Sequence, residues 1–506
     1  MLKAIDNFLN KITMYRLTLY CLLAIWFFGF ILSLFSKLTY KPIDLIITFA
    51  LIFLVSVAVN AIFSAAFKVP SNTDSVYITS IILALIVSPA NPLNNLDVIF
   101  LSGALAIASK YILAINKKHI FNPAAFGVAL SAFILQKYAV WWIGTLYMAP
   151  IVLVAGLLMV RKIQRFDLVF SFLLTSLTFI VGHSLLYSQD LVLIVRQLVI
   201  DSPWMFMAFV MLTEPATTPS TRNTRIVYGM LVGVLFTPFI NIIGFYFTPE
   251  LALLTSNIFS YLINPKEKLV LLLKEKKLIA HNVYNFIFSK NKEMKFQPGQ
   301  YMEWTLGHEK KDNRGMRRYF TIASSPTEKD IIIGVKFYDK PSSYKKALDS
   351  LIEGKTIIAS QLAGDFTLSR DKKKKLVFLA GGIGVTPFRS MIKYLLDKKE
   401  KRDIIMYYAN KSFSDIAYED IFSKAQEELG IKIIHVLDDS NGVPNGFSFE
   451  KGPITMDMIK NEVPDYKDRI FYVSGPKLMV DSFKKELSDL GISRLHIKTD
   501  FFPGFA

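Results

Sequence analysis

Cysteine is almost absent from this sequence of 506 residues, which contains only Cys21. A single cysteine excludes an internal disulfide, a cysteine-ligated iron–sulfur cluster, c-type haem attachment and a cysteine-based zinc site. Cys21 lies in an apolar run, where we interpret it as a small buried hydrophobic side chain. The chain therefore has too few thiolates to build a metal centre, and we predict no metal site.

Histidine is also scarce, with six residues in the whole chain, and only His119 and His183 fall within residues 1–263. A transmembrane haem with two axial histidines needs a pair on facing helices at similar depth. His119 and His183 are expected near opposite membrane faces. We therefore do not expect haem, or a membrane domain of the ferric-reductase or NADPH-oxidase type.

Charged residues are few in the first half of the chain. Residues 1–263 contain 25 of them and residues 264–506 contain 74, whereas soluble domains average about a quarter. This split predicts a membrane half followed by a soluble half. The net charge of +17 is explained by cytoplasmic loops and an anionic leaflet surface, so we expect membrane lipid rather than nucleic acid as a partner.

Ten apolar runs in the first half are candidate membrane spans. They fall near 15–36, 43–66, 76–90, 96–115, 120–136, 139–160, 167–187, 190–213, 226–247 and 249–263. The first run is too long for the apolar region of a signal peptide and has no small-residue cleavage site, so we expect no cleavable signal peptide.

The lysines and arginines of the loops predict the orientation of these spans. With the N-terminus inside, the inner loops carry Lys68, Lys117, Lys118, Arg161, Lys162, Arg165, Arg222 and Arg225, and the outer loops carry only Lys37, Lys41 and Lys137. Ten spans then return the chain to the cytoplasm. We expect a multi-pass protein of the cytoplasmic membrane whose N-terminus and soluble half are both cytoplasmic.

Two of the ten runs are interrupted. The third, 76–90, is short and is followed by Pro92, and the eighth, 190–213, contains Arg196 and Pro203. Broken spans at matching positions of two halves indicate an inverted repeat with a site near mid-membrane. Two ordinary short helices followed by proline-containing loops are the alternative.

Two polar strings stand out in the apolar half. One runs from Lys110 to Gly127, and the other runs from Met211 to Arg225. Glu214 ends an apolar run, and a carboxylate in such a place is a functional hypothesis by default. Hydroxyls and arginines beside it suit a phosphate or the polar edge of a ring, although a positive-inside loop explains the arginines equally well. The candidate residues for a membrane flavin or acceptor site are Lys110, Asn122, Pro123, Thr213, Glu214, Thr217, Thr218 and Arg222.

The strings FNPAAFG (121–127) and TEPATTP (213–219), followed by arginines and Tyr228-Gly229, resemble the family of membrane proteins found in the sodium-pumping NADH:quinone reductase and in the Rnf complex. The resemblance covers residues 15–263 and implies a flavin, often FMN esterified to a threonine in a Ser/Thr-Gly-Ala-Thr motif. Here the nearest string, Ser102–Leu105, lacks that threonine. A non-covalent FMN or riboflavin, or no flavin, therefore remains open for the membrane half.

The second half changes its periodicity once. Residues 264–370 alternate apolar and polar side chains between turns, which predicts a small antiparallel β-barrel. Residues 371–506 alternate strands with helices, which predicts a doubly wound parallel sheet. The predicted strands are Leu376–Ala380, Ile404–Ala409, Ile431–Leu437 and Ile470–Val473, and the helices are 387–397, 416–429 and 476–489.

The glycine-rich string Gly381–Pro387 follows the first of these strands and opens a helix. Such glycines let the backbone approach a diphosphate, and the helix N-terminus supplies N–H donors. The absence of an arginine cluster after the strand that ends at Ala409 weakly favours NADH over NADPH, and Asp415 lies a little further along. The candidate NAD(P)-binding residues are Gly381, Gly382, Gly384, Thr386, Pro387, Asn410, Lys411, Ser474, Gly475 and Pro476.

The string RYFTIASSP (318–326) places a guanidinium, an aromatic ring and a hydroxyl on one strand. Arg318 and Phe320 project to one side and Thr321 to the other. Ser342 or Ser343 is a natural N-cap and anion site before the helical run 344–352. Taken alone, each could be structural, as a core aromatic or an ordinary cap.

These motifs, with QPGQY (297–301), QLAGDFTL (361–368) and the tail FFPGF (501–505), resemble the ferredoxin–NADP reductase family over residues 265–506. The resemblance implies FAD on the barrel and NAD(P)H on the sheet domain. It also implies that Arg318 and Ser343 bind the FAD diphosphate and that Phe320 and Thr321 hold the isoalloxazine, with Phe501, Phe502 or Phe505 as a lid. The candidate FAD-binding residues are Arg318, Tyr319, Phe320, Thr321, Ser342, Ser343, Phe501 and Phe502.

The two resemblances together predict a membrane-bound NAD(P)H-oxidising flavoenzyme. Hydride would pass from NAD(P)H to FAD, and electrons would pass to a flavin in the membrane half and on to a quinone or an extracytoplasmic redox protein. Three alternatives remain: a membrane-anchored flavoreductase with redox-silent spans, a redox-coupled ion transporter with Glu214 as its main carboxylate, and reverse flow that reduces NAD(P)⁺. The sequence leaves a homodimer open.

Overall fold

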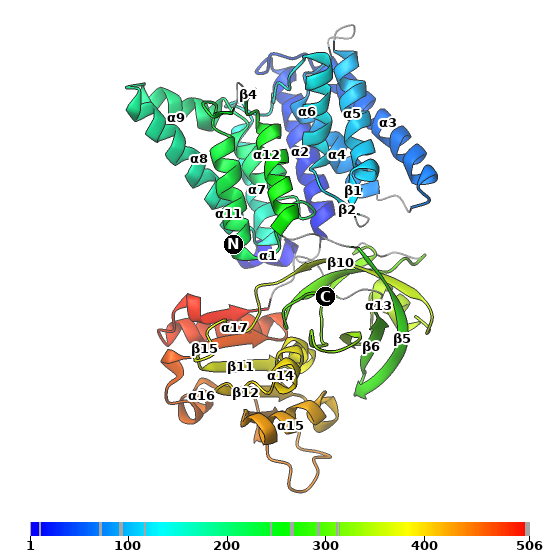
Figure 1. Cartoon of the computed structure of the whole chain (residues 1–506), viewed down its shortest axis with the longest axis vertical. Helices are drawn as coiled ribbons and strands as arrows, with labels where there is room; N and C mark the ends of the chain where they lie inside the picture. The colour runs from blue at the N-terminus through cyan, green and yellow to red at the C-terminus, as the bar shows by residue number, and fades with distance from the viewer. Residues whose placement is uncertain are drawn as a thin grey trace. The chain divides into compact units, whose positions relative to one another are not determined.

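The computed structural model describes residues 2–9, 12–69, 73–90, 95–115, 118–242, 245–263, 268–290, 294–309, 312 and 314–500. The chain divides into two compact units, Met1–Lys268 and Leu269–Ala506, which we call the helical unit and the α/β unit (Figure 1). The predicted boundary at residue 263 lies five residues before this division.

The helical unit consists of α-helices with one π-helical segment. Their bounds are α1 (Leu2–Leu9), α2 (Met14–Leu34), α3 (Pro42–Ala66), α4 (Thr73–Ile86), α5 (Leu96–Ile112), α6 (Pro123–Leu135), α7 (Ala149–Ile163), α8 (Phe166–Leu186), α9 (Leu191–Ile200), α10 (Trp204–Phe206), η1 (Met207–Met211), α11 (Arg222–Leu235) and α12 (Pro249–Ile263). Among the described residues, α2, α3 and α8 are long and apolar enough to cross a membrane. The bent pair Leu191–Ile200 and Trp204–Met211 makes a fourth if it counts as one span.

Two of the predicted spans are wrong in their extent. The run 139–160 becomes helical only at Ala149, and the run 226–247 stops being helical at Leu235. In the first case the chain before α7 caps another helix, because Trp141 N donates to Ile86 O at 3.0 Å and Trp142 Nε1 donates to Ala84 O at 2.9 Å. These bonds satisfy carbonyls at the C-terminal end of α4 that no helix partner reaches. The apolar composition of the first segment reflects the burial of Trp141, Trp142 and Ile143 rather than a helix.

Both predicted interruptions are confirmed. Helix α4 ends at Ile86 after 14 residues, and α9 is bent by 54° from the following segment. Pro203 lies in that break, immediately before α10. A proline lacks the N–H that would continue the helical ladder, so it explains the bend.

The helices pair in the same way in the first and second parts of the helical unit. Helix α2 packs on α4, α3 on α5, and α5 on α6. In the second part α7 packs on η1, α8 on α11, and α11 on α12. Contacts between α2 and α7 and between α6 and α12 join the two parts.

Each part also ends with the same succession of elements. Helix α5 is followed by the hairpin β1 (Ala114–Ile115) and β2 (Lys118–His119), and α11 by the hairpin β3 (Asn241–Ile242) and β4 (Phe245–Tyr246). A proline is then the first residue of both following helices, Pro123 in α6 and Pro249 in α12. The two hairpins lie at opposite ends of the helical unit (Figure 1).

The α/β unit contains the two predicted sheets. The antiparallel sheet has the strand order β8-β7-β10-β5-β6-β9. Its elements are β5 (Leu269–Ala280), β6 (Val283–Ser289), β7 (Tyr301–Thr305), β8 (Arg317–Thr321), β9 (Ile331–Lys336), α13 (Ser343–Asp349) and β10 (Thr356–Ala363).

The parallel sheet has the strand order β14-β13-β12-β11-β15-β16. Its elements are β11 (Leu376–Gly381), η2 (Gly382–Val385), α14 (Thr386–Lys398), β12 (Ile404–Asn410), η3 (Phe413–Asp415), α15 (Glu419–Leu429), β13 (Lys432–Leu437), β14 (Glu450–Lys451), α16 (Met456–Glu462), η4 (Tyr466–Asp468), β15 (Ile470–Ser474), α17 (Lys477–Asp489), η5 (Arg494–His496) and β16 (Ile497–Thr499). The sequence predicted neither α16 nor the two short edge strands, β14 and β16.

Buried polar contacts join the two sheets. Tyr418 Oη donates to Asn285 Oδ1 at 2.6 Å, and Ser390 Oγ donates to Ser324 O at 2.7 Å. Gly334 of β9 lies so close to the parallel-sheet domain that an added Cβ would lie 2.5 Å from Tyr418 Oη and 2.8 Å from Thr386 Cγ2. These contacts hold the strand that follows the RYFT segment beside the start of α14.

Gly127 sets the distance between α5 and α6. A Cβ at this position would lie 2.4 Å from Ser102 O and 2.7 Å from Ala106 Cβ. We expect Gly127→Val to destabilise the helical unit by about 1–3 kcal/mol, because the extra atoms overpack the interface. The measurement is the unfolding midpoint of the full chain in detergent.

Gly182→Val in α8 is the matched control, because a Cβ there meets nothing within 4 Å. It places the same β-branched residue within another helix of the unit. Equal midpoints for the two variants would contradict the packing role of Gly127.

Candidate functional site

The glycine-rich turn after β11 contacts the turn after β15. A Cβ on Gly384 would lie 2.5 Å from Gly475 Cα and 2.6 Å from Gly475 N, and a Cβ on Gly381 would lie 2.4 Å from Met479 Sδ. Gly382 has a φ of 51°, which favours glycine. The string therefore needs glycine because the two turns approach one another closely, and the approach to a diphosphate stays a prediction.

The strand register brings the predicted nucleotide-binding residues to one edge of the sheet. Ala380 pairs with Ser474, and Gly381 pairs with Ala409, so β11, β12 and β15 end together. The order of the strands reverses at β11, which lies between β12 and β15. Ligands of open α/β sheets bind in the crevice at such a switch point.

The carboxylate of Asp415 accepts two hydrogen bonds from within the α/β unit. Its Oδ1 accepts from Lys336 Nζ at 2.6 Å, and its Oδ2 accepts from Ser412 Oγ at 2.9 Å. Burial acts to raise the pKa of this carboxyl, but the hydrogen bonds from Lys336 and Ser412 outweigh it and hold the pKa below its ordinary value. The carboxylate thus joins η3 to β9, beside the end of β12.

In the antiparallel sheet, β8 presents Arg318 and Phe320 to the same neighbour. The Arg318 guanidinium lies 5.0 Å from the centre of the Tyr344 ring, and the Phe320 ring lies 6.1 Å from it. Tyr319 has other partners, because its ring packs 5.7 Å from that of Tyr301 and its Oη donates to Glu303 Oε2 at 2.9 Å. The predicted alternation is therefore observed, and it separates Tyr319 from the other two candidates.

Positive charge gathers beside Arg318. Burial, and after it the charges of Arg318 and Arg314, lower the pKa of Lys345 to about 8. Burial also lowers the pKa of Arg318 to about 10, and the nearest oxygen of Asp312 lies 3.8 Å away. The three cations, Arg314, Arg318 and Lys345, repel one another and have only the Asp312 carboxylate beside them, so this place favours binding of an anion. Guanidinium groups match the geometry of phosphate. This donor set fits the diphosphate of FAD.

The two serines before α13 have different partners. Ser342 is the N-cap, and its Oγ accepts from Lys345 N at 3.2 Å. Ser343 Oγ accepts from Asp312 N at 3.0 Å and lies 3.0 Å from His308 Nε2. His308 and Asp312 lie in a loop without a sequence pattern, so only the structure finds them.

The remaining predicted residues of this site can be placed in part. Ser474 Oγ lies 3.3 Å from Asp500 Oδ2 at the end of the parallel sheet. Thr386 Oγ1 donates to Ile383 O at 3.2 Å, and Pro387 lies in the first turn of α14. Phe501, Phe502 and Phe505 lie outside the described residues.

In the helical unit the two polar strings come together. Asn122 caps α6 by accepting from Ala125 N at 3.1 Å, and its own N donates to Asn257 Oδ1 at 2.8 Å. Asn257 Nδ2 then donates to Tyr228 Oη at 2.7 Å. Residues from the first string, from α11 and from α12 thus share one buried network.

Glu214 belongs to the same cluster. Its Oε1 lies 3.3 Å from His119 Nε2, and its Oε2 accepts from Thr217 Oγ1 at 3.3 Å. Thr218 Oγ1 donates to Glu214 O at 3.1 Å, whereas Thr213 Oγ1 donates back along its own helix to Phe209 O. The predicted carboxylate therefore has a histidine partner from the other string.

Lys110 and Arg222 are not equivalent members of this site. Lys110 Nζ donates to Ser75 O, Ser75 Oγ and Thr79 Oγ1 at 2.8–3.0 Å, which ties α5 to α4. Arg222 is exposed at the first residue of α11. The buried arginine is Arg225, which pairs with Asp167 at 2.8 Å.

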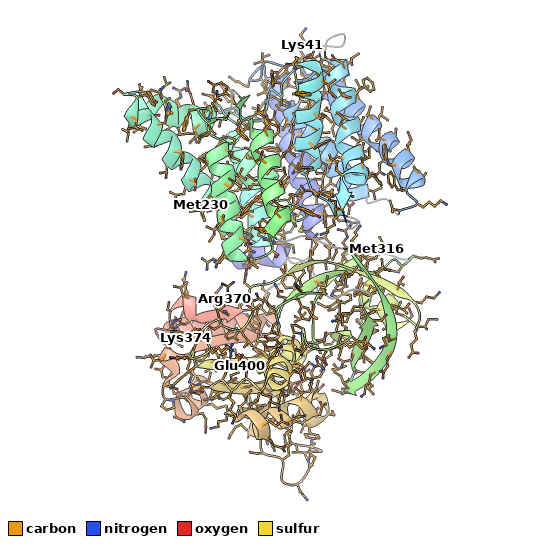
Figure 2. The ribbon with its side chains drawn as sticks, viewed as in Figure 1. Lys41, Met230, Met316, Arg370, Lys374 and Glu400 are labelled. Atoms are coloured by element: carbon orange, nitrogen blue, oxygen red, sulfur yellow. The ribbon has the colours of Figure 1, made fainter. Side chains whose placement is uncertain are left out.

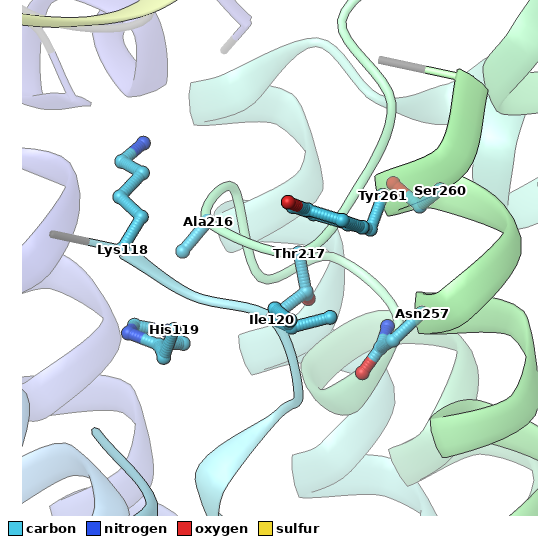
Figure 3. Close-up of a pocket in the computed structure, with 8 residues that line it drawn as sticks. All are labelled: Lys118, His119, Ile120, Ala216, Thr217, Asn257, Ser260 and Tyr261. Atoms are coloured by element: carbon cyan, nitrogen blue, oxygen red, sulfur yellow. The ribbon is translucent and has the colours of Figure 1, made fainter. Parts of the chain in front are cut away.

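A small pocket, with a cavity volume of about 20 Å³, opens beside Glu214. It is lined by Lys118, His119, Ile120, Ala216, Thr217, Asn257, Ser260 and Tyr261. Figure 3 shows Lys118 and His119 on one side and the α12 residues on the other, with Ala216 and Thr217 between them.

The sequence did not predict the contribution of α12 to this pocket. That segment looked like an ordinary apolar span, and its polar residues carry no known motif. The signal was the spacing of Asn257 and Tyr261, four residues apart, which places them on one helical face. Ser102 of the SGAL string, by contrast, is fully buried within α5. Gly127 of α6 packs against it.

Comparison with known proteins agrees with the division of the chain into a helical unit and an α/β unit. Residues 135–268 match the NQR2, RnfD, RnfE family, and residues 378–485 match the oxidoreductase NAD-binding domain. Part of the helical unit is thus similar to the NQR2, RnfD, RnfE family, and part of the α/β unit is similar to NAD-binding oxidoreductases. Both resemblances predicted from the motifs are therefore confirmed.

Curated relatives cover the α/β unit. NADH-cytochrome b5 reductase 1 of Aspergillus terreus is 29% identical over 243 residues, which are 46% of this chain and 81% of that protein. The protein of the same name from Ajellomyces capsulatus is 28% identical over 46% of this chain and 77% of its own length. The cytochrome b5 reductase domain of Ulva prolifera nitrate reductase is 21% identical, with a TM-score of 0.40, over 46% of this chain and 97% of that chain. The NAD-binding match and the two curated relatives show that the α/β unit is an NAD(P)H-dependent flavin reductase.

Arg318 should decide whether FAD is retained. We expect Arg318→Gln to weaken FAD binding about 10- to 100-fold, which corresponds to the loss of one charge-assisted contact. The matched control is Arg317→Gln, because Arg317 precedes it on β8 and lies 3.6 Å from Glu303 instead. FAD dissociation, followed by flavin fluorescence, checks the prediction, and equal losses in both variants would contradict it.

FAD affinity should also depend on pH. Lys345, whose pKa lies at about 8, is charged below that pH and neutral above it, and an anionic diphosphate binds the charged form. Affinity should therefore be highest near pH 7 and fall as the pH rises towards about 9. We expect Lys345→Gln to flatten this profile and Lys346→Gln, an exposed neighbour on α13, to leave it unchanged.

Proposed function

We propose that this chain is a membrane-bound NAD(P)H-oxidising flavoenzyme that passes electrons from its α/β unit into its helical unit. There a second flavin would carry them to a quinone or to an extracytoplasmic acceptor. One observation carries the proposal: the two polar strings of the helical unit converge on one partly buried cluster around Glu214 and Asn257.

The reductase chemistry needs a bound flavin, which accepts a hydride and releases single electrons. The chain's own residues bind and orient. Arg318 and Lys345 supply positive charge for the FAD diphosphate. The turn at Gly384 packs against the turn at Gly475, and its backbone N–H groups would face the nicotinamide nucleotide. Residues 410–415 contain no arginine, which supports NADH as the substrate.

The buried cluster argues against spans that serve only as an anchor. Burying an amide or a hydroxyl without a partner costs about 1–3 kcal/mol, and apolar helices anchor a protein without any such group. Here Asn122, Asn257 and Tyr228 are buried and bonded to one another. Intramembrane polar groups of this kind are typical of ligand or ion pathways.

The chain between the units is short. Residues 264–268 separate α12 from β5, and the six Cα–Cα steps from Ile263 to Leu269 reach at most about 20 Å. The pocket residues Ser260 and Tyr261 lie in the last turn of α12. A short tether supports electron transfer between the units.

We further infer that the helical unit is a ten-span inverted repeat. The repeated helix pairing and the two hairpins at opposite ends support it. Lys118 lies in one hairpin, and Lys41, which the sequence places outside, lies at the opposite end of the unit (Figure 2). The positive-inside rule then places the first hairpin, the N-terminus and the α/β unit on the cytoplasmic side.

Flavin content tests the proposed function. The full chain is purified in detergent, its flavin is released with acid, and FAD is separated from FMN and riboflavin. We expect one FAD and one second flavin per chain, and Arg318→Gln should lose only the FAD. One FAD per chain and no second flavin would contradict the two-carrier path.

A further inference from the structure

The outer face of β5 begins with exposed apolar side chains. Val270 and Leu272 are 40% and 41% exposed, whereas Leu271 and Leu273 are buried in the core of the antiparallel sheet. Successive side chains of a strand point to opposite faces, so Val270 and Leu272 share the face that points away from this core. Single exposed apolar residues are ordinary on a protein surface, so the neighbours of this pair determine its significance.

The neighbouring segments extend this apolar face. Ile358 of β10 is half-buried and pairs with Val270, and residues that pair across two strands lie on the same face. Ile352 is 64% exposed in the turn before β10, and Gly354 N of this turn donates to Leu273 O at 2.9 Å. The β5 patch is the name we give to this surface, which consists of Val270, Leu272, Ile352 and Ile358.

Lysines surround the β5 patch. Lys268 precedes β5, Lys274 follows the patch along β5, and Lys355 lies in the turn before β10, and all three are exposed. Lys274 pairs with Asp330 at 2.8 Å, and Glu353 is the acidic residue of the turn. An apolar surface with a rim of lysines suits the surface of a bilayer, where apolar side chains meet acyl chains and lysines meet phosphate groups.

The short tether keeps the β5 patch close to the end of a membrane helix. Seven Cα–Cα steps join Ile263 of α12 to Val270, which reach at most about 24 Å. Leu262 and Ile263 are themselves 71% and 42% exposed, as expected for a helix end that faces lipid. Because the tether makes the contact intramolecular, a contact too weak to hold a free protein is sufficient here.

We propose that the β5 patch binds the surface of the lipid bilayer and holds the α/β unit against it. Lipid is the occupant because the rim of lysines complements phosphate and because the patch follows a lipid-facing helix end within a few residues. The proposal goes beyond the proposed function, since it requires the helical unit to lie in the bilayer but requires no electron transfer between the units.

The single cysteine of the chain allows a direct test. Cys21 is buried, and Cys21→Ser gives a background in which each introduced cysteine carries the only label. The full chain with Leu272→Cys is labelled with the fluorophore NBD and placed in nanodiscs of equal parts phosphatidylcholine and phosphatidylglycerol, with or without nitroxide-labelled lipid. The nitroxide should quench the label about twofold, because apolar groups at an interface lie about 5–10 Å deep in the lipid.

Two other label positions serve as controls. Leu278 is 59% exposed on the same strand and lies about 20 Å further along it, so a label on Leu278→Cys should be quenched by iodide in water and not by the nitroxide. Leu174 is 68% exposed in α8, and a label on Leu174→Cys should be quenched by the nitroxide.

A charge in the patch separates docking from mere proximity through the tether. Ile352→Glu adds a carboxylate that resists entry into the interface and is repelled by phosphatidylglycerol. In the protein labelled through Leu272→Cys, it should lower the nitroxide quenching to the level of the Leu278→Cys label. Leu278→Glu is the matched control, because it adds the same charge elsewhere on β5 and should leave the quenching unchanged.

Three results would overturn the proposal. Equal quenching at position 272 with and without Ile352→Glu means that the tether alone brings the label near lipid. A label at position 272 that neither the nitroxide nor iodide quenches means that protein covers the patch. A label at position 174 that the nitroxide does not quench means that α8 lies outside the bilayer, and the membrane location in the proposed function then falls as well.

Failure of the proposed function alone looks different. A single FAD per chain and no second flavin would refute the two-carrier path, while quenching at position 272 that Ile352→Glu removes would still support docking. The rate at which NADH reduces ferricyanide in Ile352→Glu should equal that of the wild type, which shows that the α/β unit is folded in this variant.

Discussion

Polar groups buried among apolar helices must find their partners within the protein, and the helical unit depends on this constraint. Asn122 satisfies the first turn of α6 and binds Asn257 of α12, which in turn binds Tyr228 of α11. This chain of bonds fixes where the two polar strings lie relative to one another. Glu214 and His119 can meet only because the helices that carry them are held in this way, so the same bonds that stabilise the unit also build its pocket.

The α/β unit differs from the helical unit because it concentrates positive charge at one place. Three cations lie near Asp312, namely Arg314, Arg318 and Lys345. Burial lowers the pKa of Lys345. A bound diphosphate relieves this repulsion, so part of the unit's stability should come from its cofactor. Gly381 and Gly384 let the turn after β11 approach the turn after β15, and the contacts of Gly334 bring β9 against the parallel-sheet domain.

The sequence predicted the elements whose periodicity or motifs are strong. These are the two sheets, the glycine-rich turn, the alternation along β8 and the interruptions of α4 and α9. It was wrong about residues 139–148, because a loop that buries two tryptophans where it caps α4 has the same apolar composition as a helix. It missed Asn257 and Tyr261, because two polar residues on an apolar helix have no distinctive pattern until another segment packs against them. Tertiary contacts also separated Arg222, which is exposed, from Arg225, which pairs with Asp167.

The central claim is that the two units form one electron path. Anaerobic titration of the full chain with NADH, followed at the flavin absorbance band, tests it most directly. The account predicts that bleaching continues until two equivalents of NADH per chain have been added, because a flavin in each unit accepts a pair of electrons. An end point at one equivalent, with the flavin fully bleached, would contradict it.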